Sequence, residues 1–104
     1  MIRATRRDNS VSVIWKLERT AHHYQLEWEY AFPPEHGAPT DYPVHKLREV
    51  DGKMVYFRGT MGVWDNRWTH DAAGRLVRFR SCPVQEHDDG SETQGEWTEW
   101  TPWV

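Results

Sequence analysis

Residues 24–30 alternate strictly between apolar and polar side chains, and this alternation constrains the fold more than any other feature of the sequence. The apolar positions carry aromatic or aliphatic groups at every second residue: Tyr24, Leu26, Trp28 and Tyr30. Successive side chains of a β-strand point to opposite faces, whereas a helix would mix these residues with His23 and Glu27 on one face. The pattern therefore predicts a strand with one buried and one solvated face.

The segment before it shows a similar alternation and predicts a second strand over residues 11–17. Its apolar positions are Val11, Val13, Trp15 and Leu17. Only residues 19–23 separate the two predicted strands, and a connection this short is typical of strands that are neighbours in a sheet. We therefore expect them to form an antiparallel hairpin.

A second hairpin is predicted around Asp51 and Gly52, because this dipeptide favours a two-residue β-turn. The turn would join strands at residues 44–50 and 53–58. Their apolar side chains fall on both faces, so both faces are expected to be covered. The first of these strands has an alternative, since Pro43 is also a suitable first residue for a short helix.

A third hairpin is predicted around residues 71–74, where Asp-Ala-Ala-Gly is typical of a type I turn with glycine in the left-handed conformation. Its incoming strand would contain Trp64 and Trp68, and its outgoing strand would span residues 76–81. In the polar segment that follows, the Asp-Gly pair at residues 89–90 predicts another turn, after which the tryptophan-containing end could return as a last strand.

The predicted elements define an all-β fold: a small antiparallel meander, roll or barrel of about seven to eight strands built from consecutive hairpins. We expect a single β-rich domain over residues 1–104, with a loop at residues 31–43 that holds four of the six prolines. An acidic, tryptophan-containing segment over residues 86–104 ends the domain. The chain is poor in aliphatic residues, and seven Trp and four Tyr supply the apolar area that its core needs.

Charge is distributed unevenly along the chain. Residues 1–80 hold all 13 Lys and Arg, whereas residues 81–104 hold six acidic residues and neither Lys nor Arg, and the whole chain has a formal charge of -3. Duplex nucleic acid is therefore not expected as a partner, because binding to phosphates needs a basic surface. The acidic end favours a protein partner with a basic surface. The oligomeric state does not follow from the sequence.

Cysteine content and hydropathy indicate the compartment. The one cysteine, Cys82, cannot form an internal disulfide, which is typical of a reducing compartment, and we interpret it as a structural thiol. No apolar run reaches membrane-spanning length, and the basic residues near the start are not followed by the apolar stretch of a signal peptide. We expect a cytoplasmic protein without membrane contact.

Two constellations of polar residues suggest chemistry. His22 and His23 are a potential metal-ligand pair, but neighbours on a strand point to opposite faces and could reach one ion only at a bend, so no metal site and no cofactor are predicted. His23, Glu27 and Glu29 share the polar face of their strand and could perform acid-base chemistry if that face lined a cavity. The alternative function is then a small barrel that binds or converts an apolar, aromatic or sugar ligand in a Trp- and Tyr-lined pocket. A solvated strand face is the simpler interpretation, and no catalytic residue is predicted.

The end of the chain carries tryptophans at every third position: Trp97, Trp100 and Trp103. This spacing does not fit the period of a strand, but a left-handed extended helix with three residues per turn would align the rings. It resembles the Trp ladder of thrombospondin type 1 repeats, in which Trp and Arg side chains stack alternately, although here the Arg-containing strand precedes the tryptophans and the disulfides of that family are missing. Arg78 and Arg80 could stack on the rings within the molecule.

The alternative for these rings is that they are exposed and dock on a partner. We expect a non-catalytic binding protein, an inhibitor, adaptor or immunity-type module, in which tryptophans anchor a protein partner and acidic residues speed the encounter. The predicted binding residues are Trp97, Trp100, Trp103, Asp88, Asp89, Glu92, Glu96 and Glu99. A third hypothesis is single-stranded nucleic-acid binding through Arg75, Arg78 and Arg80, which alternate with apolar side chains.

Overall fold

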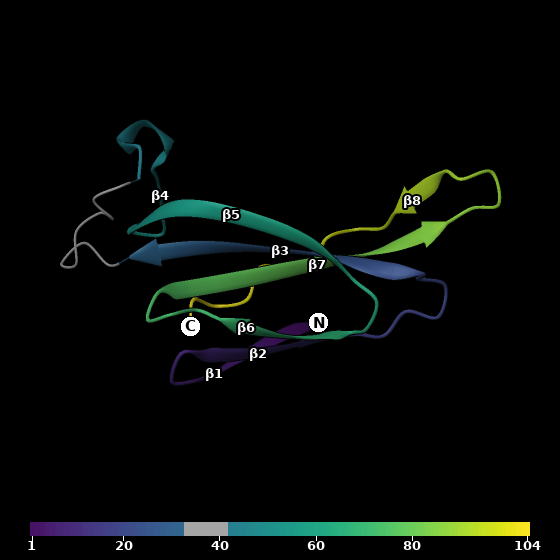
Figure 1. Ribbon diagram of the computed structural model, residues 1–104, viewed down its shortest axis with the longest axis horizontal. Coiled ribbons are helices and arrows are strands. Elements are labelled where there is room, and N and C mark those ends of the chain that lie inside the picture. Colours follow the sequence, from purple (N-terminus) through teal and green to yellow (C-terminus); the bar gives the residue numbers. More distant parts are fainter. Residues whose placement is uncertain (33–41) are drawn as a thin grey trace.

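The computed structural model describes residues 1–32 and 42–104, and these residues form two antiparallel β-sheets (Figure 1). The strands are β1 (Ile2–Arg7), β2 (Ser10–Trp15), β3 (His23–Phe32), β4 (Arg48–Val50), β5 (Lys53–Val63), β6 (Arg67–Asp71), β7 (Leu76–Glu86) and β8 (Glu92–Gln94). The all-β prediction is confirmed. Most of the predicted loop at residues 31–43 lies outside the described residues, while Ala31 and Phe32 belong to β3.

The two sheets differ in size and pack around a common core. One sheet has the strand order β1-β2-β6, and the other has the order β4-β5-β3-β7-β8. Figure 1 shows the smaller sheet lying below the larger one, with the β7–β8 hairpin projecting beyond it. No helix of the described residues is long and apolar enough to cross a membrane.

The alternation that defines β3 also positions the core. Tyr24, Leu26 and Tyr30 are buried on the side that faces the smaller sheet, where they cluster with the buried apolar residues of β2 and β7: Val11, Val13, Trp15, Val77 and Phe79. The predicted apolar face of β3 is confirmed. The opposite face carries Glu27 and Glu29, which pair in register with the outward-pointing residues of β7.

The predicted hairpin between residues 11–17 and 24–30 is wrong. β2 pairs with β1 and β6, whereas β3 pairs with β5 and β7, so the chain passes from one sheet to the other between Trp15 and His23. Leu17 lies in this crossing and is 65% exposed rather than buried. Alternation sets which face of a strand is buried, but it does not set which strand pairs with it.

The predicted pairing across residues 71–74 is also wrong. A turn with Gly74 in the left-handed conformation is present, but Ala73 is left-handed too, with a φ of 49°, so the turn is of type I′ and not of the predicted type I. β6 pairs with β2 and β7 pairs with β3, so this turn connects the two sheets. The backbone N–H of Ala73 donates to Asp71 Oδ1 at 3.0 Å, and Gly74 adopts a left-handed φ of 78°. The side chain of Asp71 therefore stabilises the turn as expected for this sequence.

The hairpin at Asp51-Gly52 is confirmed, because Val50 pairs with Lys53 across the turn. Both interpretations of the preceding segment hold in part. A single 3₁₀ turn (η2, Val44–Lys46) follows Pro43, and the short strand β4 comes after it. β5 continues well beyond the predicted end, as far as Val63.

A buried polar network lies between the two sheets around His70. The Tyr30 hydroxyl lies 2.6 Å from His70 Nε2, and Trp68 Nε1 donates to His70 Nδ1 at 3.2 Å. Because Nδ1 accepts, Nε2 carries the proton and the imidazole is neutral. Burial, reinforced by the positive charge of Arg75, lowers the pKa of His70 below its usual 6.5.

This network predicts a loss of stability in mild acid. With the pKa of His70 lowered in the folded state, the unfolded chain binds more protons just below pH 6.5, so stability falls as the pH drops through that range. Urea unfolding at about pH 7.5 and about pH 5.5 should show a smaller loss for His70→Gln than for the wild type. The exposed His45 provides the control, since His45→Gln should lose as much as the wild type. Equal losses in all three proteins would contradict this role of His70.

Candidate functional site

The C-terminal segment, residues 95–104, lies along the edge of β7 that does not pair with β3, and its backbone hydrogen bonds have an unusual spacing. Backbone N–H groups at every third residue of the segment donate to carbonyls at every second residue of the strand: Gly95 to Pro83, Thr98 to Ser81, Thr101 to Phe79 and Val104 to Val77. The segment is not a β-strand. The three-residue period predicted from the tryptophan spacing is therefore present in the backbone contacts, and the alternative of a last strand is wrong.

Two threonine side chains complete this pairing. The N–H groups of Phe79 and Ser81 donate to the hydroxyl oxygens of Thr101 and Thr98, at 3.0 and 3.1 Å. A strand partner would offer backbone carbonyls here, and the hydroxyls replace them. Sequence reasoning missed both residues, although Thr98 and Thr101 repeat with the same three-residue spacing as the tryptophans.

Arg78 and Arg80 stack between the three tryptophan rings, and we call this group the Trp-Arg ladder. The Arg78 guanidinium carbon lies 4.6 Å from the ring centroids of both Trp100 and Trp103, and that of Arg80 lies 4.5 Å from Trp97 and 4.8 Å from Trp100. Each such contact contributes roughly 0.5–2 kcal/mol, depending on how dry it is. The prediction of stacking within the molecule is confirmed, and all three rings are partly buried.

Glu29 binds three arginines on the outer face of the large sheet. Its side chain is fully buried, and its two oxygens accept hydrogen bonds from three arginines: Arg48, Arg58 and Arg78. Arg78 donates to Oε2 at 2.8 and 3.0 Å, and Arg58 donates to Oε1 at 2.6 and 3.2 Å. These arginines come from three different strands. The carboxylate therefore joins β4, β5 and β7 to β3.

Glu27 lies two residues before Glu29 on the same face of β3 and also binds arginines. Its Oε1 lies 2.7 Å from Arg80 Nη2 and 3.6 Å from Arg58 Nε. Each ladder arginine thus has a carboxylate at its nitrogen atoms and tryptophan rings at its faces. The three arginines predicted for nucleic-acid binding thus all contact other residues of this chain. Arg78 and Arg80 bind carboxylates and tryptophan rings, and the guanidinium of Arg75 lies 3.9 Å from the ring centroid of Tyr30.

In the part of the chain that the structure describes, Glu27 and Glu29 do not join His23 in a Trp- and Tyr-lined pocket. The two carboxylates bind arginines on the outer side of the large sheet, whereas His23 stacks on Trp64 with ring centroids 5.0 Å apart. Two open hollows of about 350 and 310 Å³ flank the C-terminal segment. Trp15 and Tyr24 line the larger hollow, but neither hollow is lined by these three polar residues.

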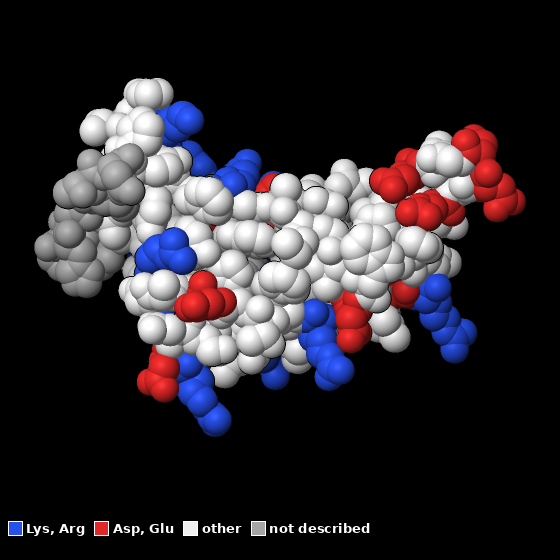
Figure 2. Space-filling model, viewed as in Figure 1, with Lys and Arg blue, Asp and Glu red and all other residues white. Residues whose placement is uncertain are grey.

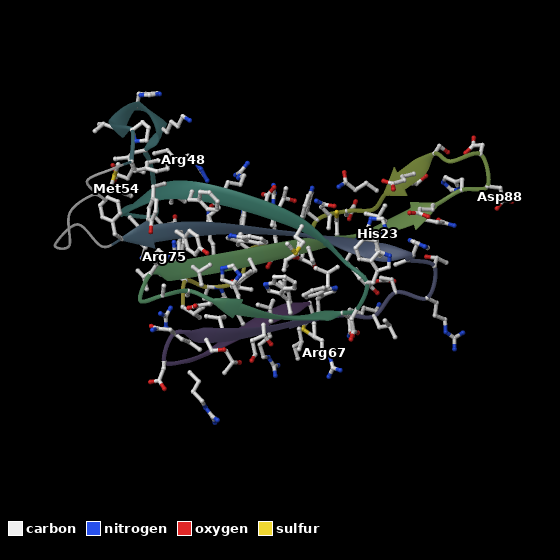
Figure 3. All side chains as sticks on the ribbon, viewed as in Figure 1. His23, Arg48, Met54, Arg67, Arg75 and Asp88 are labelled. Carbon is white, nitrogen blue, oxygen red and sulfur yellow. The ribbon has the colours of Figure 1, made fainter. Side chains whose placement is uncertain are left out.

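Three acidic residues of the predicted site, Asp88, Asp89 and Glu92, lie on one projecting hairpin, whereas Glu96 and Glu99 lie in the C-terminal segment. We call the hairpin over residues 84–94 the acidic arm; it pairs Val84 with Gln94 and Glu86 with Glu92. Figure 2 shows its acidic side chains clustered at the end of the molecule, and Figure 3 places Asp88 at its tip. Five predicted binding residues are exposed, and none forms an ion pair with a residue that the structure describes: Asp88, Asp89, Glu92, Glu96 and Glu99.

The turn of the acidic arm is stabilised by one of these carboxylates. Asp89 Oδ1 accepts hydrogen bonds from the backbone N–H and the hydroxyl of Ser91, at 2.9 and 2.6 Å. These bonds lower the pKa of Asp89. Gly90 has a left-handed φ of 86°, which confirms the turn predicted here.

Cys82 is buried on β7, and this burial raises the pKa of its thiol.

No protein-family model matches this chain, and comparisons with curated proteins and with solved structures find no match either.

The role of Glu29 predicts a specific loss of stability. Glu29→Gln keeps the shape of the side chain but removes the charge that compensates three guanidinium groups, so the free energy of unfolding should fall by about 3 kcal/mol. The exposed Glu49 lies in β4 next to Arg48, and Glu49→Gln should change stability by less than about 0.5 kcal/mol. Urea unfolding followed by tryptophan fluorescence measures both changes. Similar small effects for the two variants would show that the buried carboxylate does not hold this surface together.

Proposed function

We propose that this protein is a non-catalytic binding module, an inhibitor, adaptor or immunity-type protein, that docks its acidic arm on a basic surface of a protein partner. The observation that carries the proposal is the concentration of exposed carboxylates on and beside a projecting hairpin. Between residues 81 and 104 there is no Lys or Arg to neutralise them. A field of one sign on a projecting element attracts an oppositely charged partner over several ångströms.

The Trp-Arg ladder supports this proposal by fixing the base of the arm. The C-terminal segment begins directly after β8, where the N–H of Gly95 donates to the carbonyl of Pro83 at 2.8 Å. Trp97 then stacks on Arg80. The chain is therefore held immediately beyond the arm, and a hairpin that is ordered before binding loses less entropy when it docks. In this proposal the tryptophans position the arm, and the exposed parts of their rings lie at the rim of the interface.

The arm also limits the class of partner. Its carboxylates would repel the phosphates of nucleic acid, so the proposed partner is a protein that presents Lys and Arg. The single, buried Cys82 supports placing this interaction in the cytoplasm, where thiols stay reduced.

The test compares two variants of equal charge. The arm variant combines Asp88→Asn and Glu92→Gln on the arm with Glu96→Gln just beyond it; it spares Asp89 because that side chain stabilises the turn. The control variant, Asp8→Asn, Glu49→Gln and Asp51→Asn, removes three negative charges from exposed positions elsewhere. Each tagged protein is used to capture partners from the native lysate at low salt, and captured proteins are quantified by mass spectrometry.

The proposal predicts a stoichiometric partner that the wild type and the control variant retain, that the arm variant loses, and that added salt releases. With that partner in hand, the association rate should fall steeply as the salt concentration rises. Equal recovery of the same partner by the arm variant and the control variant would overturn the proposal, as would an association rate that does not depend on salt.

A further inference from the structure

Three potential metal ligands converge where the acidic arm leaves the large sheet. His22 Nδ1 lies 3.2 Å from His23 Nδ1 and 3.3 Å from Glu86 Oε1, and His23 Nδ1 lies 3.9 Å from the same carboxylate oxygen. Among the described residues, these three offer ligand atoms that all lie within 4.8 Å of one another. Figure 3 shows His23 close to the base of the arm.

The backbone explains how two adjacent histidines reach one point. Neighbours on a regular strand would point apart, but β3 begins only at His23, and His22 lies in a bend before it. The sequence indicates that His22 and His23 can reach one ion only at a bend, and the structure has a bend at His22. The N–H of His22 donates to the carbonyl of Val84 at 2.8 Å, which places the bend beside β7 two residues before Glu86.

The separations of the ligand atoms match the requirements of a tetrahedral ion. Zinc binds nitrogen and oxygen ligands at about 2.0–2.1 Å, so two ligand atoms of a tetrahedral site lie about 3.3–3.4 Å apart. Two of the three separations, 3.2 and 3.3 Å, are close to this value, and the third requires only a small movement of the Glu86 side chain. That side chain is 44% exposed and can make such a movement.

The surroundings hold one ligand firmly and leave the others accessible. The side chain of His23 is 9% exposed, and its ring is stacked at 23° on the indole of Trp64. The stack lies beside Gly62, where a Cβ would be 3.4 Å from the Trp64 ring and 3.7 Å from His23 Cδ2, at ordinary van der Waals contact. The side chain of His22 is 49% exposed. An ion could therefore enter from solvent and bind to an oriented imidazole.

We propose that His22, His23 and Glu86 form a binding site for a divalent transition-metal ion of the zinc class. Two imidazoles and one carboxylate are typical ligands for zinc and poor ligands for magnesium, which prefers oxygen. Three protein ligands leave at least one position for water or for a group from another molecule. The site joins the segment before β3 to the base of the acidic arm. It does not depend on the partner proposed above.

Isothermal titration of the whole protein with ZnCl₂ tests the site, with MgCl₂ as the comparison. We expect one Zn²⁺ per chain, no binding of Mg²⁺, and a rise of the melting temperature with added Zn²⁺. His22→Gln and Glu86→Gln should each weaken Zn²⁺ binding by more than about tenfold. Both side chains are about half exposed, so the variants should fold, which circular dichroism checks.

His87 is the matched control, because it is exposed on the acidic arm next to Glu86 and its Nε2 contacts the Thr93 hydroxyl instead. His87→Gln should bind Zn²⁺ as tightly as the wild type. The site would be overturned by an absence of Zn²⁺ binding, by unchanged affinity in His22→Gln and Glu86→Gln, or by an equal loss of affinity in His87→Gln.

Discussion

The ion pairs between the buried carboxylate of Glu29 and three arginines hold together the outer surface of the large sheet. An ionised group removed from water costs several kcal/mol unless close partners compensate it. Arg48, Arg58 and Arg78 supply that compensation from three strands. The same contacts hold the Arg78 guanidinium at the position where Trp100 and Trp103 stack on it. A charge inside the sheet thus organises aromatic rings on its surface.

The Trp-Arg ladder combines two periods along one edge. β7 presents an arginine at every second residue, the C-terminal segment presents a tryptophan at every third, and the backbone bonds keep the two in step. The segment also covers the edge of β7, which would otherwise be free to pair with another chain. The C-terminal segment follows the acidic arm directly. The Trp-Arg ladder therefore fixes the end of the arm to the large sheet, next to the surface that we propose for binding.

The sequence predicts local structure better than it predicts which segments meet. Alternation identified β2 and β3 and their buried faces, and the tryptophan spacing predicted both the three-residue period and the stacking on arginine. Strand pairing was wrong wherever the chain passes between sheets, since a short linker looks the same in a hairpin and in a crossing. The burial of Glu29 was also missed, because alternation places it on a polar face and its arginine partners lie 19, 29 and 49 residues away. The bend at His22 gave no signal.

The central claim is that Glu29 and the tryptophans act as one unit through Arg78, and a double-mutant cycle tests it most directly. The free energy of unfolding is measured for the wild type, Glu29→Gln, Trp100→Leu and the double variant. Trp100 stacks on Arg78 at 4.6 Å, and Arg78 donates to the Glu29 carboxylate. The account predicts that the two losses are not additive, with a coupling of at least about 1 kcal/mol. Losses that add to within about 0.3 kcal/mol would show that the carboxylate and the ladder are independent, and would contradict it.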